Sequence, residues 1–194
     1  TGSRPHCIGY YALHMALQGR PWNDCKGDEK KQFRERYDAL LADPDVDAVY
    51  VPLPNHLHVE WTLKSLAAGK PVLTEKPIVL HADEFDQLIA ARDAAGVLAA
   101  EAYMIVHHPQ WAHARDLLAD GAIGRLVRVD TTFTYDNRAD TQNIRNRADT
   151  GGGSLGDIGV YTIGSARFVT GLDMSDVRAD IDRENGVEVT CEMQ

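Results

Sequence analysis

The chain has 194 residues, and its 20 Lys and Arg residues against 29 Asp and Glu residues give a formal net charge of −9 at pH 7. With 44% hydrophobic and 25% charged residues, it has the composition of a globular protein, and its length suits one large or two small domains. No basic stripe is present to bind a polyanion, which argues against nucleic-acid and anionic-membrane partners and leaves a small molecule as the expected ligand.

The first half of the chain alternates short apolar runs with amphipathic stretches. Residues 5–32 fit no clear period and predict a loop, with a short helix at 10–18 as an option. Continuous apolar runs at 48–51, 71–73 and 97–100 predict strands that are covered on both faces.

Helices are predicted between these strands. Apolar residues at helical spacing run from Val59 to a stop at Gly69, and again from Phe85 to a stop near Gly96. The resulting β-α-β-α-β order predicts an α/β fold with a parallel, doubly wound sheet.

The second half of the chain has a different periodicity. A further helix is predicted at 111–118, and a Gly-rich turn with an apolar helix at 151–171. Apolar and polar residues alternate at 127–135, 177–182 and 187–193, which predicts an open, mostly antiparallel sheet with one buried face.

Cysteine usage and apolar run length bear on the cellular location. The three cysteines are far apart and lack C-x-x-C spacing, so neither a disulfide framework nor a zinc site is expected. No run of about 18 apolar residues predicts a membrane span, and residues 1–9 lack the layout of a signal peptide. A cytoplasmic protein is expected.

Candidate site residues follow the predicted parallel strands, because ligands of such sheets bind beyond the carboxyl ends of the strands. Pro52, Leu53, Asn55 and His58 come after the first strand, although Asn55 also suits the N-cap of the next helix, with the histidines at the surface. After the second strand comes Glu75-Lys76-Pro77, where the proline stiffens the loop that carries the lysine.

The glycine cluster at 151–156 formally matches G-x-G-x-x-G, but no strand precedes it, and we reject it as a dinucleotide turn. Asp157 and Tyr161 follow at a spacing that places both on one helix face. Simpler explanations are a helix-dipole partner for Asp157 and a half-buried core aromatic for Tyr161.

Taken together, these motifs resemble the Gfo/Idh/MocA oxidoreductases over about residues 36–175. The motifs that carry the resemblance are Pro54-Asn55-x-x-His58, Glu75-Lys76-Pro77, Glu101-Ala102-Tyr103-Met104 with His108-Pro109, and Gly151-Gly152-Gly153-x-Leu155-x-Asp157-x-Gly159-x-Tyr161.

The resemblance implies two partial domains, truncated at both ends. Residues 1–105 would be part of a Rossmann-like dinucleotide-binding domain whose first β-α unit, with a true G-x-G-x-x-G turn, precedes Thr1. Residues 106–194 would be part of an α/β substrate and oligomerisation domain, which pairs into a homodimer through its open sheet.

The resemblance also implies an NADP(H)- or NAD-dependent enzyme that oxidises a hydroxyl of a sugar or cyclic diol. By position, Lys76 would be the active-site lysine, Asp157 the substrate-orienting carboxylate and Tyr161 the acid/base group. The implied cofactor-binding residues are Ser3, Arg4, Pro52, Leu53, Asn55, His58, Glu75 and Lys76.

This chemistry is coherent for these residue types. A hydroxyl that loses hydride must also lose a proton, and a free tyrosine, with a pKa of about 10, accepts one poorly at neutral pH. The Lys76 ammonium beside Tyr161 would stabilise the phenolate.

Other interpretations stay open. Arg4 suits a 2′-phosphate but also suits a terminal residue in solvent, and the loop 143–146 could supply substrate donors or simply be solvated. A cofactor-free remnant that serves dimerisation or sugar binding, or a family member with a net glycosidase or epimerase reaction, are the competing functions.

Overall fold

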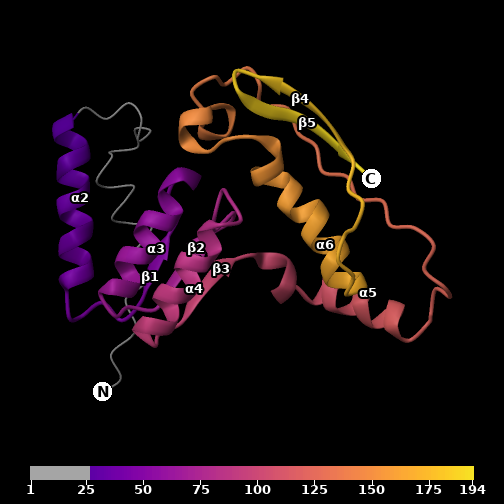
Figure 1. The fold of residues 1–194 in the computed structure, drawn as a ribbon, viewed down its shortest axis with the longest axis horizontal. Coiled ribbons are helices and arrows are strands. Elements are labelled where there is room, and N and C mark those ends of the chain that lie inside the picture. Colours follow the sequence, from indigo (N-terminus) through magenta and orange to yellow (C-terminus); the bar gives the residue numbers. More distant parts are fainter. Residues whose placement is uncertain (1–26) are drawn as a thin grey trace. The chain divides into compact units, whose positions relative to one another are not determined.

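The structure is a computed structural model that describes residues 27–194, and it divides into two compact units (Figure 1). One unit ends at Ala102, and the other runs from Tyr103 to Gln194. The elements of the first are α2 (Gly27–Ala42), β1 (Val49–Val51), η2 (Asn55–Leu57), α3 (His58–Ala67), β2 (Val72–Glu75), α4 (Glu84–Ala95) and β3 (Ala99–Ala102).

The first unit is built on a parallel sheet with the order β1-β2-β3. Val49 pairs with Val72, which in turn pairs with Ala99, so the carboxyl ends of all three strands lie at one edge. Helices α3 and α4, which connect the strands, pack against each other. The predicted α/β class and the parallel sheet are confirmed.

One face of this sheet carries the core. Val49, Val51 and Val72 are buried together with aromatic residues of the helices. Trp61 of α3 contacts the rings of Phe33 and Tyr37 of α2 at centroid distances of 6.0 and 4.4 Å. This cluster of large apolar side chains holds α2 and α3 on the sheet, because their burial removes apolar surface from water.

The prediction that these strands are covered on both faces is wrong for β2 within the described residues. Leu73 points away from the core and is 42% exposed. The continuous apolar run around it predicted a second covering layer, but both connecting helices lie together on the opposite side of the strand.

Element boundaries differ slightly from the sequence prediction. Residues 27–32 begin helix α2 instead of extending a loop, and the optional helix at 10–18 lies outside the described residues. Strand β3 begins two residues later than the apolar run, because Gly96 in the left-handed conformation ends α4 and Val97 and Leu98 complete the turn.

The second unit contains helices, one β-hairpin and long segments without regular secondary structure. Its elements are η3 (Met104–His107), α5 (Pro109–Ala119), η4 (Ile144–Asn146), η5 (Ala148–Thr150), the π-helical turn η6 (Leu155–Gly159), α6 (Val160–Thr170), β4 (Ala179–Glu184) and β5 (Val187–Met193). The antiparallel pairing of β4 and β5 was predicted, and both residues of its turn, Asn185 and Gly186, have positive φ angles.

The predicted strand at 127–135 is wrong. No strand is assigned there, and Val127 is 82% exposed. A strand needs a partner for its backbone hydrogen bonds, and the only sheet of this unit within the described residues is the two-stranded hairpin. Among the described residues, no helix is both long and apolar enough to cross a membrane. The division of the whole protein into domains 1–105 and 106–194 stays a prediction.

Core burial yields a matched pair of substitutions in the first unit. Leu66 is 1% exposed, whereas Leu98 is 80% exposed. We expect Leu66→Ala to lower the free energy of unfolding by about 2–5 kcal/mol, because it removes buried methyl groups and leaves a cavity. Leu98→Ala should change it by less than about 0.5 kcal/mol. Urea denaturation followed by circular dichroism measures both, and equal losses would contradict this description of the core.

Candidate active site

The carboxyl edge of the parallel sheet gathers the site residues predicted for the first unit. Pro52, Leu53 and Asn55 lie in the loop and short helical turn after β1, and Lys76 directly follows β2, which ends with Glu75. Leu53 is buried in the core, and its neighbours in this loop are partly or fully buried. The structure therefore brings these five residues to one edge of the sheet.

His58 has a different environment from the one predicted. Its side chain is 0% exposed at the start of α3, so it is not a surface histidine. Nδ1 lies 2.7 Å from the carbonyl oxygen of Pro77, and Nε2 lies 2.6 Å from that of Leu53. The ring therefore joins the loop after β1 to the loop after β2. Its partners are backbone groups of the protein.

The charge state of His58 follows from its burial. Burial lowers the pKa of the imidazole, while the carbonyls of Pro77 and Leu53 and the negative charge of Glu75 oppose this. A neutral ring donates one of the two hydrogen bonds, and a protonated ring donates both. In either state, at least one loop carbonyl is bound.

The loop that carries Lys76 is held by further side chains. The Lys76–Pro77 peptide bond is cis, and the next backbone amide, that of Ile78, donates to Oε1 of Glu101 at 2.9 Å. Glu75 accepts hydrogen bonds from the Tyr50 hydroxyl and, at 3.3 Å, from the amide of Lys76. Glu101 stands near the end of β3, so all three strands contribute to this edge.

In the second unit, Asp157 lies in the π-helical turn η6 and its side chain is 10% exposed. Two groups converge on its Oδ2 atom. The Tyr135 hydroxyl donates to it at 2.5 Å, and Nε of Arg145 donates at 3.0 Å. Asp157 is therefore an ion-paired and hydrogen-bonded carboxylate, which is more than the helix-dipole partner that its sequence position suggested.

Tyr161 lies in the first turn of α6, half-buried between two aromatic rings. The ring of Tyr103 stacks on it at 5.8 Å with an interplanar angle of 23°, and that of Phe133 lies at 5.8 Å on a 41° tilt. Tyr103 is fixed in turn by the hydrogen bond from its hydroxyl to the carbonyl of Val160, at 2.9 Å. A Cβ atom at Gly164 would lie 2.1 Å from that hydroxyl, so this stacking requires glycine there.

Alternate residues of the segment 131–135 cover this part of the helix. The Thr131 hydroxyl donates to the carbonyl of Thr162, Phe133 contacts Tyr161, and Tyr135 binds Asp157. These three residues are every second residue of the segment, so the alternation seen in the sequence does correspond to two different faces of the backbone. The inner face packs on a helix and not on a neighbouring strand. Asp157 and Tyr161 consequently lie on the same side of η6 and α6.

The glycine run before Asp157 serves close packing. A Cβ atom at Gly152 would lie 2.5 Å from the carbonyl oxygen of Arg145, and one at Gly153 would collide with the carboxylate of Glu188. Gly153 also has a φ of 127°, which other residues rarely adopt. These contacts place the backbone of Arg145 near Asp157 and explain the glycines without a phosphate ligand.

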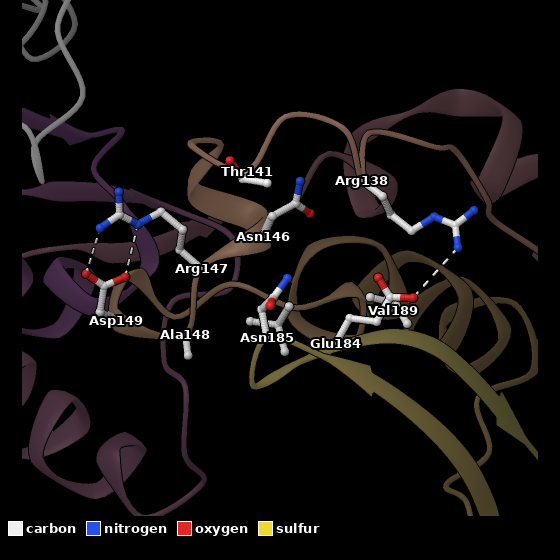
Figure 2. Close-up of a pocket in the computed structure, with 10 residues that line it drawn as sticks. Arg138, Thr141, Asn146, Arg147, Ala148, Asp149, Glu184, Asn185 and Val189 are labelled. Atoms are coloured by element: carbon white, nitrogen blue, oxygen red, sulfur yellow. Dashed lines mark hydrogen bonds and ion pairs between the residues drawn. The ribbon is translucent and has the colours of Figure 1, made fainter.

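The second unit also contains a pocket of about 450 Å³, between the loop 138–149 and the tip of the β4–β5 hairpin (Figure 2). Its arginines are paired with acids: Nη1 of Arg138 lies 3.9 Å from Oε1 of Glu184, and Arg147 binds Asp149 through two hydrogen bonds of 3.1 and 3.0 Å. Neither Asp157 nor Tyr161 lines this pocket.

A dinucleotide would fit the edge of the first unit. The loop after β1 contains Nδ1 of His56, a buried nitrogen without a hydrogen-bond partner among the described residues. The proline-stiffened loops after β1 and β2 also carry the partly exposed side chains of Asn55, Glu75 and Lys76 at the strand ends, where parallel sheets bind such ligands. No group of three or more metal-ligating side chains occurs in the described part of the chain.

Some predictions for the site extend beyond this geometry. Ser3 and Arg4 lie outside the described residues. A contact of Lys76 with Tyr161 would join the two units and stays a prediction. The sequence pattern did not indicate the contacts that Tyr135 and Glu101 make, and it left the function of the loop with Arg145 open. For Tyr135, the available signal was its spacing of two residues from Phe133, which places both side chains on one face of the segment.

Comparison with known proteins relates both units to one family. Residues 17–103 match a family model described as the oxidoreductase family with an NAD-binding Rossmann fold, and residues 111–194 match the GFO/IDH/MocA C-terminal domain. The chain is 40% identical over 182 residues to a dTDP-3,4-didehydro-2,6-dideoxy-alpha-D-glucose 3-reductase of Actinomadura kijaniata, covering 90% of this chain and 53% of that protein.

Two further similarities extend this result. A D-xylose 1-dehydrogenase (NADP(+)) of Haloferax volcanii is 39% identical over 135 residues, which cover 70% of this chain and 41% of that protein. The crystal structure of a 3-ketoreductase from Actinomadura kijaniata with NADP and TDP-benzene has a TM-score of 0.62 at 34% identity, covering 90% of this chain and 57% of the other. The chain spans about half the length of the curated relatives it matches.

The contact between Tyr135 and Asp157 predicts an abnormal titration. Burial, together with the hydrogen bond and charge of Asp157, raises the pKa of Tyr135 to about 12. A tyrosine in the unfolded chain has a pKa of about 10, so between about pH 10 and about pH 12 the folded state keeps a proton that the unfolded state loses. The free energy of unfolding should therefore fall as the pH rises from about 10 to about 12.

Spectrophotometric titration of tyrosinate absorbance tests this prediction. Tyr135→Phe should remove a group that ionises near pH 12. Asp157→Asn should lower the pKa of Tyr135 only in part, because burial, the largest single cause of the shift, remains. If the titration curves of the wild type and Tyr135→Phe instead differ by a group that ionises at about pH 10, the contact between Tyr135 and Asp157 would be wrong.

Proposed function

Because the chain belongs to the Gfo/Idh/MocA family of oxidoreductases, we propose that it forms part of an NADP(H)-dependent enzyme. The reaction is hydride transfer between the nicotinamide and a hydroxyl-bearing or carbonyl carbon of a sugar or cyclic diol. A homodimer formed through the open sheet of the second domain is part of the proposal.

The observation that carries this proposal is the common placement of Asp157 and Tyr161. Both lie on the side of η6 and α6 that the segment 131–135 covers, with Asp157 bound by Tyr135 and Tyr161 packed against Phe133. A carboxylate and a phenol on the same helix side would act on hydroxyls of one substrate, the carboxylate by accepting a hydrogen bond and the phenol by exchanging a proton.

The proposed cofactor site is the carboxyl edge of β1 and β2. Pro52, Leu53, Asn55, Glu75 and Lys76 would form its described part, and Ser3 and Arg4 its ribose end. His58, which is fully buried, would act on it through the loops it binds. The bound nicotinamide supplies the hydride acceptor or donor, which no side chain of the protein provides.

Proton transfer falls to the chain's own residues. Tyr161 would accept the proton of the substrate hydroxyl in oxidation and return it in reduction. The Lys76 ammonium would stabilise its phenolate form, because an opposite charge nearby favours the ionised state. Asp157 would accept a hydrogen bond from a substrate hydroxyl, and its ion pair with Arg145 holds the carboxylate in position for this task.

The substrate class follows from the relatives. A 3-reductase of a dTDP-linked keto sugar and a xylose dehydrogenase both act on sugars, the first on a nucleotide-linked dideoxy keto sugar and the second on a free sugar. A fixed carboxylate acceptor suits a sugar that bears a hydroxyl in the bound state, because a ligand without a matching hydroxyl would leave the buried carboxylate without that partner.

Replacement of the Tyr161 hydroxyl tests the proton-transfer role. In the full-length protein, Tyr161→Phe should lower kcat by about 10²–10⁴-fold, because the acid/base group is lost while the ring contacts remain. NADPH affinity, measured by fluorescence titration, should stay the same.

Tyr37→Phe is the matched control. The Tyr37 hydroxyl is buried in the core of the first unit without a hydrogen-bond partner among the described residues, so its removal should leave kcat unchanged. Full activity of Tyr161→Phe would contradict the role of Tyr161, and absence of NADPH binding by the wild-type protein would contradict the proposed function.

A further inference from the structure

We propose that His58 and Glu101 are positioning residues for Lys76, which they hold in place by binding the backbone on the carboxyl side of the lysine. The inference rests on the proposed function of Lys76. It assigns to His58 a role other than direct contact with the cofactor, and it assigns to Glu101 a role at the site.

The two contacts lie on consecutive residues of the Lys76 loop. The ring of His58 lies 2.7 Å from the carbonyl oxygen of Pro77, and Oε1 of Glu101 accepts the amide of Ile78 at 2.9 Å. Pro77 and Ile78 are themselves buried. The backbone that follows Lys76 is therefore hydrogen-bonded by one side chain from α3 and by one from β3.

His58 is itself rigidly held. Its backbone carbonyl accepts a hydrogen bond from the Thr62 hydroxyl at 2.7 Å, and that hydroxyl lies 2.6 Å from the hydroxyl of Thr74 in β2. All three side chains are 0% exposed. This buried polar network ties the first turn of α3, which carries His58, to the strand that leads into Lys76.

The opposite side of Lys76 is also tied. Glu75 accepts hydrogen bonds from the backbone amide of Lys76 and from the hydroxyl of Tyr50 in β1. The lysine backbone is therefore constrained on both sides, while its long side chain extends from a fixed base. Such preorganisation is needed where a charged group must act on a proton transfer, because a misplacement of about 1 Å can cost about 100-fold in rate.

A merely structural role would have a different signature, and the same loop supplies a control. Glu84 binds the amides of Leu80 and His81 at 2.8 and 2.9 Å through its Oε2 atom. It makes the same type of contact as Glu101 in the same connection, but farther from Lys76 and at the start of α4. Loss of Glu84 should therefore disturb the helix end and leave Lys76 in place.

The test is a set of double-mutant cycles in the full-length protein. Glu101→Ala and His58→Gln should each lower kcat by about tenfold or more with little change in KM, and Glu101→Gln, which keeps the acceptor oxygen, should retain most of the rate. In a Lys76→Ala background, neither change should reduce the residual rate further, because the group being positioned is absent. Glu84→Ala should leave kcat unchanged in both backgrounds.

Amide hydrogen exchange gives a readout that needs neither cofactor nor activity. Glu101→Ala should speed exchange at Ile78 by about tenfold and leave Leu80 and His81 unchanged, and Glu84→Ala should do the reverse. If His58→Gln fails to fold, the Glu101 and Glu84 variants decide the outcome.

The outcomes separate the two proposals. Equal losses from Glu101→Ala with and without Lys76, or no loss in either, would overturn the positioning role while leaving the proposed function intact. A Lys76→Ala variant with the wild-type rate would overturn the proposed role of Lys76 and this inference with it.

Discussion

The buried ring of His58 is the contact on which the strand-end edge of the first unit depends. Its nitrogens lie against the carbonyl oxygens of Leu53 and Pro77, which belong to the loops after β1 and β2. A buried polar group left without a partner costs about 1–3 kcal/mol, so these hydrogen bonds stabilise the positions of the ring and of both loops. The second unit follows the same rule, since Oδ2 of Asp157 draws in Tyr135 and Arg145. In each unit, buried polar contacts fix the backbone that carries the proposed reactive groups.

Hydrophobic periodicity correctly predicted the elements that pack against elements close to them in the sequence. The helices α3 and α4 and the parallel sheet were found because each β-α step is local and leaves an apolar pattern in the sequence. The segment 127–135 shows where this stops. Its alternation correctly indicated two different faces, but a period of two does not say whether a strand or a helix lies against the backbone. Periodicity also does not show whether a second layer covers the outer face of a strand, as the exposure of Leu73 illustrates.

The sequence motifs indicated which residues lie near one another, but not the contacts that their side chains make; their roles in a site stay predictions. Motif positions brought Asn55 and Lys76 to one strand edge and Asp157 and Tyr161 to one helix face. The burial of His58 was missed because a histidine after a strand has the same sequence pattern whether its ring faces solvent or the core. The pairing of Arg145 with Asp157 bridges a glycine turn that only close backbone packing explains. Such contacts depend on tertiary geometry that no local pattern encodes.

We propose that hydride passes directly between the nicotinamide and a carbon of a sugar or diol, with this chain supplying orientation and proton transfer. The decisive experiment uses NADPH deuterated at C4, a panel of keto sugars and aldoses, and the full-length protein, with deuterium in the products measured by mass spectrometry. Direct transfer leaves deuterium bound to carbon in the product, delivered from one face of the nicotinamide. Turnover that yields product without deuterium from the nicotinamide, or with deuterium taken only from heavy water, would rule out this reaction.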